Sequence, residues 1–158
     1  MTKLLYLDDS SFFESSAQIL GINEVDWRID MILNQTIFYP QWWWQPCDKW
    51  EIICLDWVFE VEDVRLDLQW IVHHYWILTW NIKVWDEVKL KIDESRRVLN
   101  SRLHSAGHLI DCWVKALWWS IKPLKWYHFP NWPYVEYIWE LDDLENNALK
   151  LQGVLDEM

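Results

Sequence analysis

Residues 3–92 consist of short apolar runs separated by polar and turn-forming residues. Two of them, "DVRLDLQ" (63–69) and "EVKLKID" (87–93), alternate apolar and polar positions, which is typical of a strand with one buried face. The other runs also have the length and composition of short strands and lie at 3–8, 28–33, 35–40 and 51–56. Runs spaced about ten residues apart, with turn signals between them, predict an antiparallel β-barrel or sandwich.

The hydrophobic period changes after Asp93, a residue suited to cap the start of a helix. Apolar residues then recur near helical spacing and predict a helix over about 93–118: Val98, Leu103, Ile110, Val114 and Leu117. A shorter helix is predicted over 11–21, ending at Gly21.

The last third of the chain predicts a hairpin followed by a helix. In the segment 122–139, Phe129 and Tyr134 lie on either side of an Asn-Trp-Pro turn, and the acidic stretch 141–158 has a helical pattern. The chain is therefore expected to be an α+β protein, with a β-rich domain at 1–92 and a second domain at 93–158.

Composition adds expectations about the compartment. The 158 residues are 52% hydrophobic, which is ample for a core, and no apolar run approaches the ~18 residues of a membrane span. Acidic residues stand where a signal peptide would end, so no export signal is expected. An odd number of cysteines (Cys47, Cys54 and Cys112) indicates reduced thiols and a cytoplasmic protein.

Tryptophan and glycine occur in unusual numbers. The chain has 16 tryptophans and 3 glycines, whereas average usage would give roughly 11 glycines. Several tryptophans follow Asp or Asn, where glycine would complete a hairpin turn: Asp26-Trp27, Asp56-Trp57 and Asn131-Trp132. We interpret most tryptophans as replacements of glycine. The alternative is a tryptophan-rich surface that stacks bases or sugars.

The charge is negative overall but unevenly distributed. A net charge of −11 argues against non-specific nucleic-acid binding. Residues 83–125, however, carry nine of the fourteen basic residues and five acidic ones, a local net charge of +4. This window could contact phosphate groups or could be an ordinary solvated helix face, and both interpretations stay open.

His104 and His108 are the strongest candidates for a metal site. Four residues apart on a helix, they share one face and lie about one turn apart, so both rings could bind one zinc ion. Ser105 follows the first histidine where the metalloprotease pattern requires glutamate, which excludes that class. The alternative is an ordinary pair of helix histidines with no ligand.

The remaining candidate ligands are weaker. Cys112 lies eight residues beyond His104, about 12 Å along a helix axis, so one straight helix cannot supply all three ligands. His128 could be brought in by the hairpin, although a structural role is the simpler expectation. His73 and His74 would point to opposite faces of a strand and are not expected to form a joint site.

Three stretches of the chain resemble the alanyl-tRNA editing family, which comprises free-standing editing proteins and the editing domain of alanyl-tRNA synthetase. "QTIFYPQWWWQPCDKWEI" (35–52) is similar to the family's Thr-x-Phe-Tyr-Pro motif, followed by three glycines, Gln and Asp-x-Gly. "VWDEVKLKIDESRRVLNSRLHSAGHLID" (84–111) resembles its barrel-closing strand, linker and zinc-binding helix. "WYHFPNWPYVEYIW" (126–139) fits the free-standing members if tryptophans are read as glycines.

The resemblance implies an enzyme that hydrolyses the ester joining serine or glycine to tRNA(Ala), and a partner that presents the tRNA 3′ end. It also implies an N-terminal antiparallel β-barrel followed by an α+β editing domain. His104 and His108 match the zinc-binding histidines, Thr36 the residue that faces the amino-acid side chain, and Gln45 the glutamine near the amino-acid end of the substrate.

The chain departs from the family in two respects. Residues 42–44 are tryptophans in place of three glycines, and the family's second ligand pair, Cys-x-x-x-His, has no counterpart before Met158. Two of four zinc ligands imply weak Zn²⁺ binding. Side chains at positions that need positive φ cost ~1–2 kcal/mol each, so we expect loose folding or aggregation, measurable as a non-cooperative melt by circular dichroism. The alternative function is therefore a non-catalytic tRNA-binding protein or an inactive altered copy.

Overall fold

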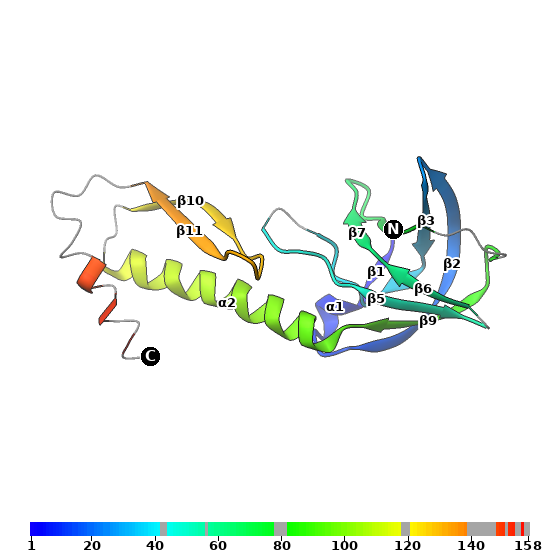
Figure 1. Ribbon diagram of the computed structural model, residues 1–158, viewed down its shortest axis with the longest axis horizontal. Coiled ribbons are helices and arrows are strands. Elements are labelled where there is room, and N and C mark those ends of the chain that lie inside the picture. The colour runs from blue at the N-terminus through cyan, green and yellow to red at the C-terminus, as the bar shows by residue number, and fades with distance from the viewer. Residues whose placement is uncertain are drawn as a thin grey trace. The chain divides into compact units, whose positions relative to one another are not determined.

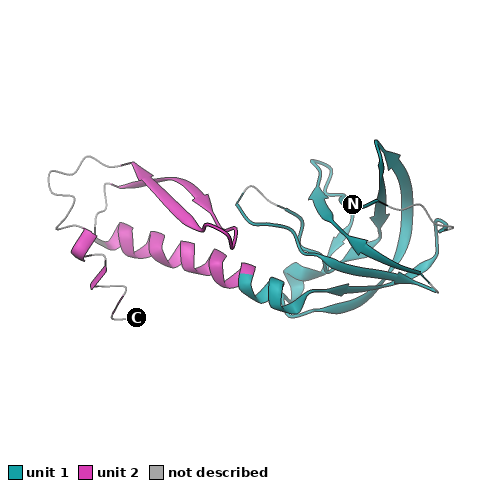
Figure 2. Ribbon diagram, in the orientation of Figure 1, with its two compact units in different colours: residues 1–99 teal, residues 100–158 magenta. Residues whose placement is uncertain are grey.

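The computed structural model describes the chain except for residues 42–43, 56, 78–81, 118–120, 139–147, 151, 154–155 and 157–158. The chain divides into two compact units, residues 1–99 and 100–158 (Figure 2). The predicted functional division at 92/93 stays a prediction.

The first unit is built on a seven-stranded sheet with the strand order β6-β5-β9-β2-β3-β8-β7 (Figure 1). All of its neighbouring strands are antiparallel, as predicted. The strands are β2 (Glu14–Val25), β3 (Arg28–Leu33), β5 (Trp50–Cys54), β6 (Trp57–Val61), β7 (Asp63–Leu66), β8 (Val72–Trp76) and β9 (Glu87–Ile92). Beside the sheet, β1 (Lys3–Leu4) pairs in parallel with β4 (Gln35–Thr36), and α1 is Leu5–Asp8.

The predicted closed barrel is wrong: the sheet is open, with β6 and β7 as its two edges. The strands β6 and β7 are consecutive in the chain. Glu62, which lies between them, donates its N–H to the carbonyl of Tyr75 in β8 at 2.9 Å. This bond places β7 against β8 and not against β6. The sheet still curls over one core, because Phe59 of β6 lies 5.2 Å, centroid to centroid, from Trp76 of β8.

The predicted helix over 11–21 is also wrong, because β2 occupies Glu14–Val25. Ala17 and Ile19 are buried at every second position, which is the period of a strand. The start of β2 pairs with β9 and its end with β3, with a register shift between Ile19 and Gly21. Pairing on both sides outweighs the weak helical preference of the segment.

The second unit consists of a long helix and a hairpin. The helix α2 (Glu94–Leu117) begins in the first unit and has the predicted bounds to within one residue. The strands β10 (Lys122–Tyr127) and β11 (Tyr134–Ile138) form the predicted antiparallel hairpin. Within the predicted C-terminal helix, residues 148–150, 152–153 and 156 are helical and the others lie outside the described residues. Over the described ranges, no helix is long and apolar enough to cross a membrane.

The tryptophans show two features expected of residues in glycine positions. Seven of the ten described tryptophans are exposed, although tryptophan is normally well buried. Three of the five described non-glycine residues with positive φ are Trp50 (139°), Trp70 (61°) and Trp85 (81°). Trp27 and Trp132 do not have positive φ, so the torsional argument does not hold at these two turns, and the turn at Asp56 lies outside the described residues. Trp42 and Trp43 lie outside the described residues.

Candidate functional site

The two predicted metal-binding histidines face each other on α2. The Nε2 atoms of His104 and His108 are 2.9 Å apart, and the ring centroids are separated by 4.7 Å. The helix places the rings on the same face because residues four apart differ by about one turn. His108 is exposed, whereas His104 is partly buried, and its Nδ1 is buried without a hydrogen-bond partner among the described residues.

The hairpin brings a third imidazole to this pair. His128 directly follows β10, is 2% exposed, and its ring centroid lies 5.0 Å from that of His104 and 6.3 Å from that of His108. Burial, followed by the proximity of the other two histidines, lowers the pKa of His128 to about 4. Burial and His108 also lower the pKa of His104. Both rings are therefore neutral near pH 7, which is the form that binds a metal.

The histidine pair fits one half of a tetrahedral metal site. Zinc–nitrogen bonds of ~2.0–2.1 Å place two ligand nitrogens roughly 3.3 Å apart, a few tenths of an ångström more than the observed separation. Within the part of the chain that the structure describes, no group of three or more His, Cys, Asp or Glu side chains has metal-binding geometry. Cys112 is exposed on the same helix, and His73 and His74 lie on opposite faces of β8, as expected.

The hairpin is held over this face of α2 by a buried carboxylate. Asp111, one turn beyond the histidines, accepts hydrogen bonds from Trp126 Nε1 at 2.5 Å and from the Tyr137 hydroxyl at 2.6 Å. Burial and Asp111 raise the pKa of Tyr137, so the phenol remains a donor throughout the neutral range. Donors from both strands of the hairpin therefore anchor it to the helix.

Thr36, the residue expected to face the amino acid, lies in the first unit and is fully buried. Its hydroxyl donates to His74 Nε2 at 2.9 Å and accepts from the Phe38 amide at 3.1 Å. His74 is also fully buried, and its Nδ1 donates to the Met31 carbonyl at 3.1 Å. Burial lowers the pKa of His74 to about 4, which keeps the ring neutral. The Met31 carbonyl, which can only accept a hydrogen bond, fixes this tautomer.

Gln45, the second predicted residue, is 5% exposed in the loop that leads to Asp48. Asp48 and Arg97 form a buried ion pair through Arg97 Nη2, and Arg97 also donates to the carbonyls of Ile37 (2.5 Å) and Ser10 (2.8 Å). Asp48 accepts in turn from the Tyr39 amide at 2.7 Å. Arg97 therefore ties the first turns of α2 to the segment after Thr36 and to the loop after Gln45.

Sequence reasoning missed His74, Arg97, Asp48 and Gly107 as determinants of these arrangements. Gly107 offered a signal, because a glycine inside a helix costs about 1 kcal/mol relative to alanine and calls for a packing reason. The buried ion pair between Arg97 and Asp48 joins residues far apart in the sequence, so no local sequence pattern predicts it.

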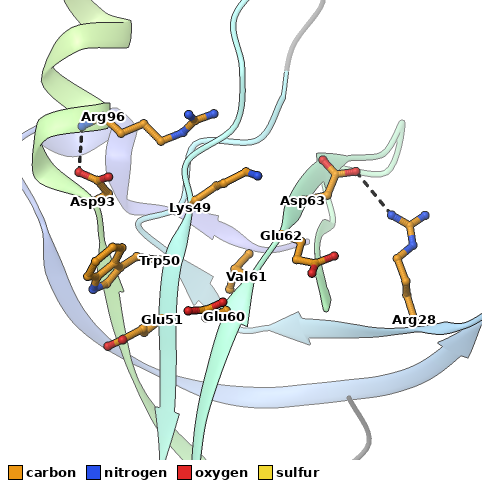
Figure 3. A pocket seen from close by; sticks show the side chains of 10 residues that line it. All are labelled: Arg28, Lys49, Trp50, Glu51, Glu60, Val61, Glu62, Asp63, Asp93 and Arg96. Carbon is orange, nitrogen blue, oxygen red and sulfur yellow. Dashed lines mark hydrogen bonds and ion pairs between the residues drawn. The ribbon is translucent and has the colours of Figure 1, made fainter. Parts of the chain in front are cut away.

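The first unit also has a cavity of about 600 Å³ that contains none of the predicted site residues (Figure 3). Its lining has five carboxylates and three cationic side chains: Glu51, Glu60, Glu62, Asp63, Asp93, Arg28, Lys49 and Arg96, together with Trp50 and Val61. This charge balance disfavours a phosphate-rich ligand.

Part of the basic window at 83–125 is engaged within the protein. Lys89 and Lys91 bind Glu14 at 2.6 and 3.2 Å, Arg96 donates to the Cys47 carbonyl at 3.0 Å, and Arg97 is buried. The prediction of a phosphate contact therefore rests on the other basic residues of the window.

Comparison with known proteins identifies several relatives of this chain. No family model matches it. Alanyl-tRNA editing protein AlaX-M of Pyrococcus horikoshii is 36% identical over 111 residues, which are 70% of this chain and 48% of that protein. The chain belongs to the alanyl-tRNA editing family.

Other relatives in the alanyl-tRNA editing family include alanyl-tRNA editing protein AlaX-L of the same organism, 29% identical over 75% of this chain and 29% of its own length. The alanine–tRNA ligase of Haloquadratum walsbyi is 33% identical over 69% of this chain and 12% of its own length. The chain thus spans about half the length of AlaX-M and smaller parts of the other two.

Proposed function

We propose that this chain is an aminoacyl-tRNA deacylase that hydrolyses the ester of serine or glycine mischarged on tRNA(Ala). Membership of the editing family supports the substrate class, and the names of its relatives associate them with alanyl-tRNA. The 2.9 Å approach of the two ring nitrogens of His104 and His108 carries the proposal, because it offers two imidazole nitrogens to one Zn²⁺ ion. The partner is the 3′ end of tRNA(Ala), and the location is the cytoplasm.

Each residue has a stated role. His104 and His108 hold the metal, which when bound supplies a Lewis acid that orients the ester or activates a water. Gln45, buried in the loop before Asp48, lies near the amino-acid end of the substrate. Thr36 faces the amino-acid side chain; its hydroxyl already makes two hydrogen bonds, so it recognises the substrate by excluding groups that cannot fit beside it.

A second candidate is a non-catalytic tRNA-binding protein or an inactive altered copy of an editing enzyme. The complete burial of Thr36 favours it, because a side chain without accessible surface must become uncovered before it can contact a substrate. The tryptophans at positive φ favour it as well.

The test is a deacylation assay with Ser-tRNA(Ala), Gly-tRNA(Ala) and correctly charged Ala-tRNA(Ala), with and without a chelator. The proposal predicts hydrolysis of the first two, and loss of turnover both with chelator and in the variant His104→Ala/His108→Ala. tRNA binding, followed by fluorescence anisotropy, should persist in that variant.

Retained binding without any turnover by the parent chain would establish the second candidate. The same assay on a chain with all sixteen tryptophans changed to glycine separates a wrong assignment from an impaired copy. Turnover by that chain alone identifies the impaired copy.

A further inference from the structure

His104 lacks the hydrogen bond that usually orients a metal-binding histidine. In most such sites the ring nitrogen that does not bind the metal donates to a carboxylate, carbonyl or water. The Nδ1 atom of His104 is buried and has no partner among the described residues. Apart from the contact between its Nε2 and that of His108, the orientation of this ring therefore depends on packing.

His128 supplies that packing. Its ring contacts that of His104, with centroids 5.0 Å apart and planes inclined by 44°, and it lies farther from His108. Because His128 is 2% exposed, it cannot move aside without disturbing the hairpin.

Gly107 provides the space in which His128 sits. A Cβ atom at this position would lie 2.2 Å from His128 Cε1 and 2.9 Å from Nδ1, distances that side-chain carbons do not adopt. Comparable Cβ atoms at Gly21 and Gly153 would meet ordinary contacts or none. The cost of a glycine inside α2 is thus explained by the ring that covers it.

We propose that His128 is a positioning residue of the histidine pair: its ring, seated on Gly107, holds the His104 imidazole with Nε2 toward His108. This inference rests on the proposed metal-dependent function of the pair and adds a residue that acts on it through packing alone. The Asp111 anchor, one turn further along α2, holds the hairpin in place for this contact.

The experiment measures Co²⁺ affinity and the visible Co²⁺ spectrum of the full chain and four variants. His128→Ala should weaken Co²⁺ binding about tenfold, as loss of supporting residues does at other metal sites. His128→Phe keeps a ring on Gly107 and should stay within about threefold of the parent. Gly107→Ala should behave like His128→Ala, because the added Cβ displaces the ring, and Gly153→Ala serves as the matched control.

Two outcomes overturn the proposal. Unchanged binding by His128→Ala shows that the ring does not position His104. Equal loss in His128→Phe and His128→Ala shows that a histidine nitrogen is needed, so His128 acts as a ligand and not through packing. Urea denaturation of each variant verifies that it is folded.

A second readout does not depend on the metal. In the parent and in His128→Phe, NMR should show a nuclear Overhauser contact between the His104 and His108 rings, and this contact should weaken in His128→Ala and Gly107→Ala. If the parent binds no Co²⁺, the proposed metal function fails, while the NMR contact still decides the positioning role.

Discussion

His74 in the first unit and His104 in the second show two ways in which a protein can hold a neutral histidine. Burial lowers the pKa of both rings. Both nitrogens of His74 are used, one by the Met31 carbonyl and the other by the Thr36 hydroxyl. His104 has an unpartnered Nδ1, and its Nε2 faces another imidazole. Burial alone therefore does not distinguish a structural histidine from one available to a ligand, whereas hydrogen-bond saturation does.

The largest expected effect concerns the buried ion pair between Asp48 and Arg97, whose charged groups, like the two nitrogens of His74, have partners inside the first unit. Asp48→Ala leaves the Arg97 guanidinium buried without its carboxylate, which should lower the free energy of unfolding by about 3–5 kcal/mol. Arg65→Ala removes an ion pair with Asp63 nearer the surface and should cost less than about 1 kcal/mol. Urea denaturation measures both, and equal losses would contradict the distinction between the two pairs.

The second prediction concerns the loss of folding stability at acidic pH. The pKa of His74 is about 4 in the folded chain and 6.5 ordinarily, so the unfolded chain binds the proton more readily. Its contribution to stability is complete above pH 6.5 and is lost as the pH falls toward 4, by on the order of 3 kcal/mol. His74→Gln should flatten this decline in urea denaturation between pH 7 and 4. His128, whose pKa is also about 4, accounts for part of the remaining slope.

His104→Gln is the matched variant for this measurement. Since the His104 ring is partly exposed, its replacement should change the pH dependence less than His74→Gln does. The opposite order would show that the unpartnered histidine is the more strongly shifted one in solution.

A smaller effect is expected at Asp111 in the second unit, where each carboxylate oxygen accepts a hydrogen bond. Tyr137→Phe removes one of the two hydrogen bonds to Asp111 and should destabilise the hairpin by about 1–2 kcal/mol. Hydrogen exchange of the β10 and β11 amides reports this loss locally. Tyr127→Phe, which keeps its ring stacked on Phe129 and Tyr134, should leave exchange nearly unchanged.

The smallest expected effect is a gain in stability. Trp85 is 65% exposed and has φ of 81°, so Trp85→Gly should raise the free energy of unfolding by about 1 kcal/mol. Trp27→Gly, at a residue without positive φ, should bring no gain, because glycine there only increases the freedom of the unfolded chain. Thermal melts of both variants provide the measurement.

Local patterns predicted those parts of the fold that depend on neighbours in the chain. The helical spacing around Val98 and Val114 located α2, and the Asn-Trp-Pro turn located the β10–β11 hairpin. The segment 11–21 was misassigned because its strand conformation comes from pairing with β9 and β3, which are distant in sequence. The barrel was wrongly predicted for a similar reason, since one amide of Glu62 directs the chain to β8.

In the candidate site, too, features that depend on chain neighbours were predictable and features that depend on distant contacts were not. The four-residue spacing of His104 and His108 was sufficient to place their rings together. The burial of Thr36 against His74 could not be read from the sequence, because it depends on the register of β8 across the sheet. The seat of His128 on Gly107 likewise requires the hairpin to be docked on the helix.

The open sheet has a consequence for the behaviour of the chain in concentrated solution. In the described part of the chain, β6 pairs with β5 alone, whereas the outer side of β7 carries a bridge between Gln41 and Arg65. The edge of β6 therefore presents a row of backbone donors and acceptors to a strand from another molecule. Val58, on β6, is 55% exposed and adds an apolar contact for such a strand. Growth of soluble oligomers with protein concentration is therefore expected while each copy is still folded.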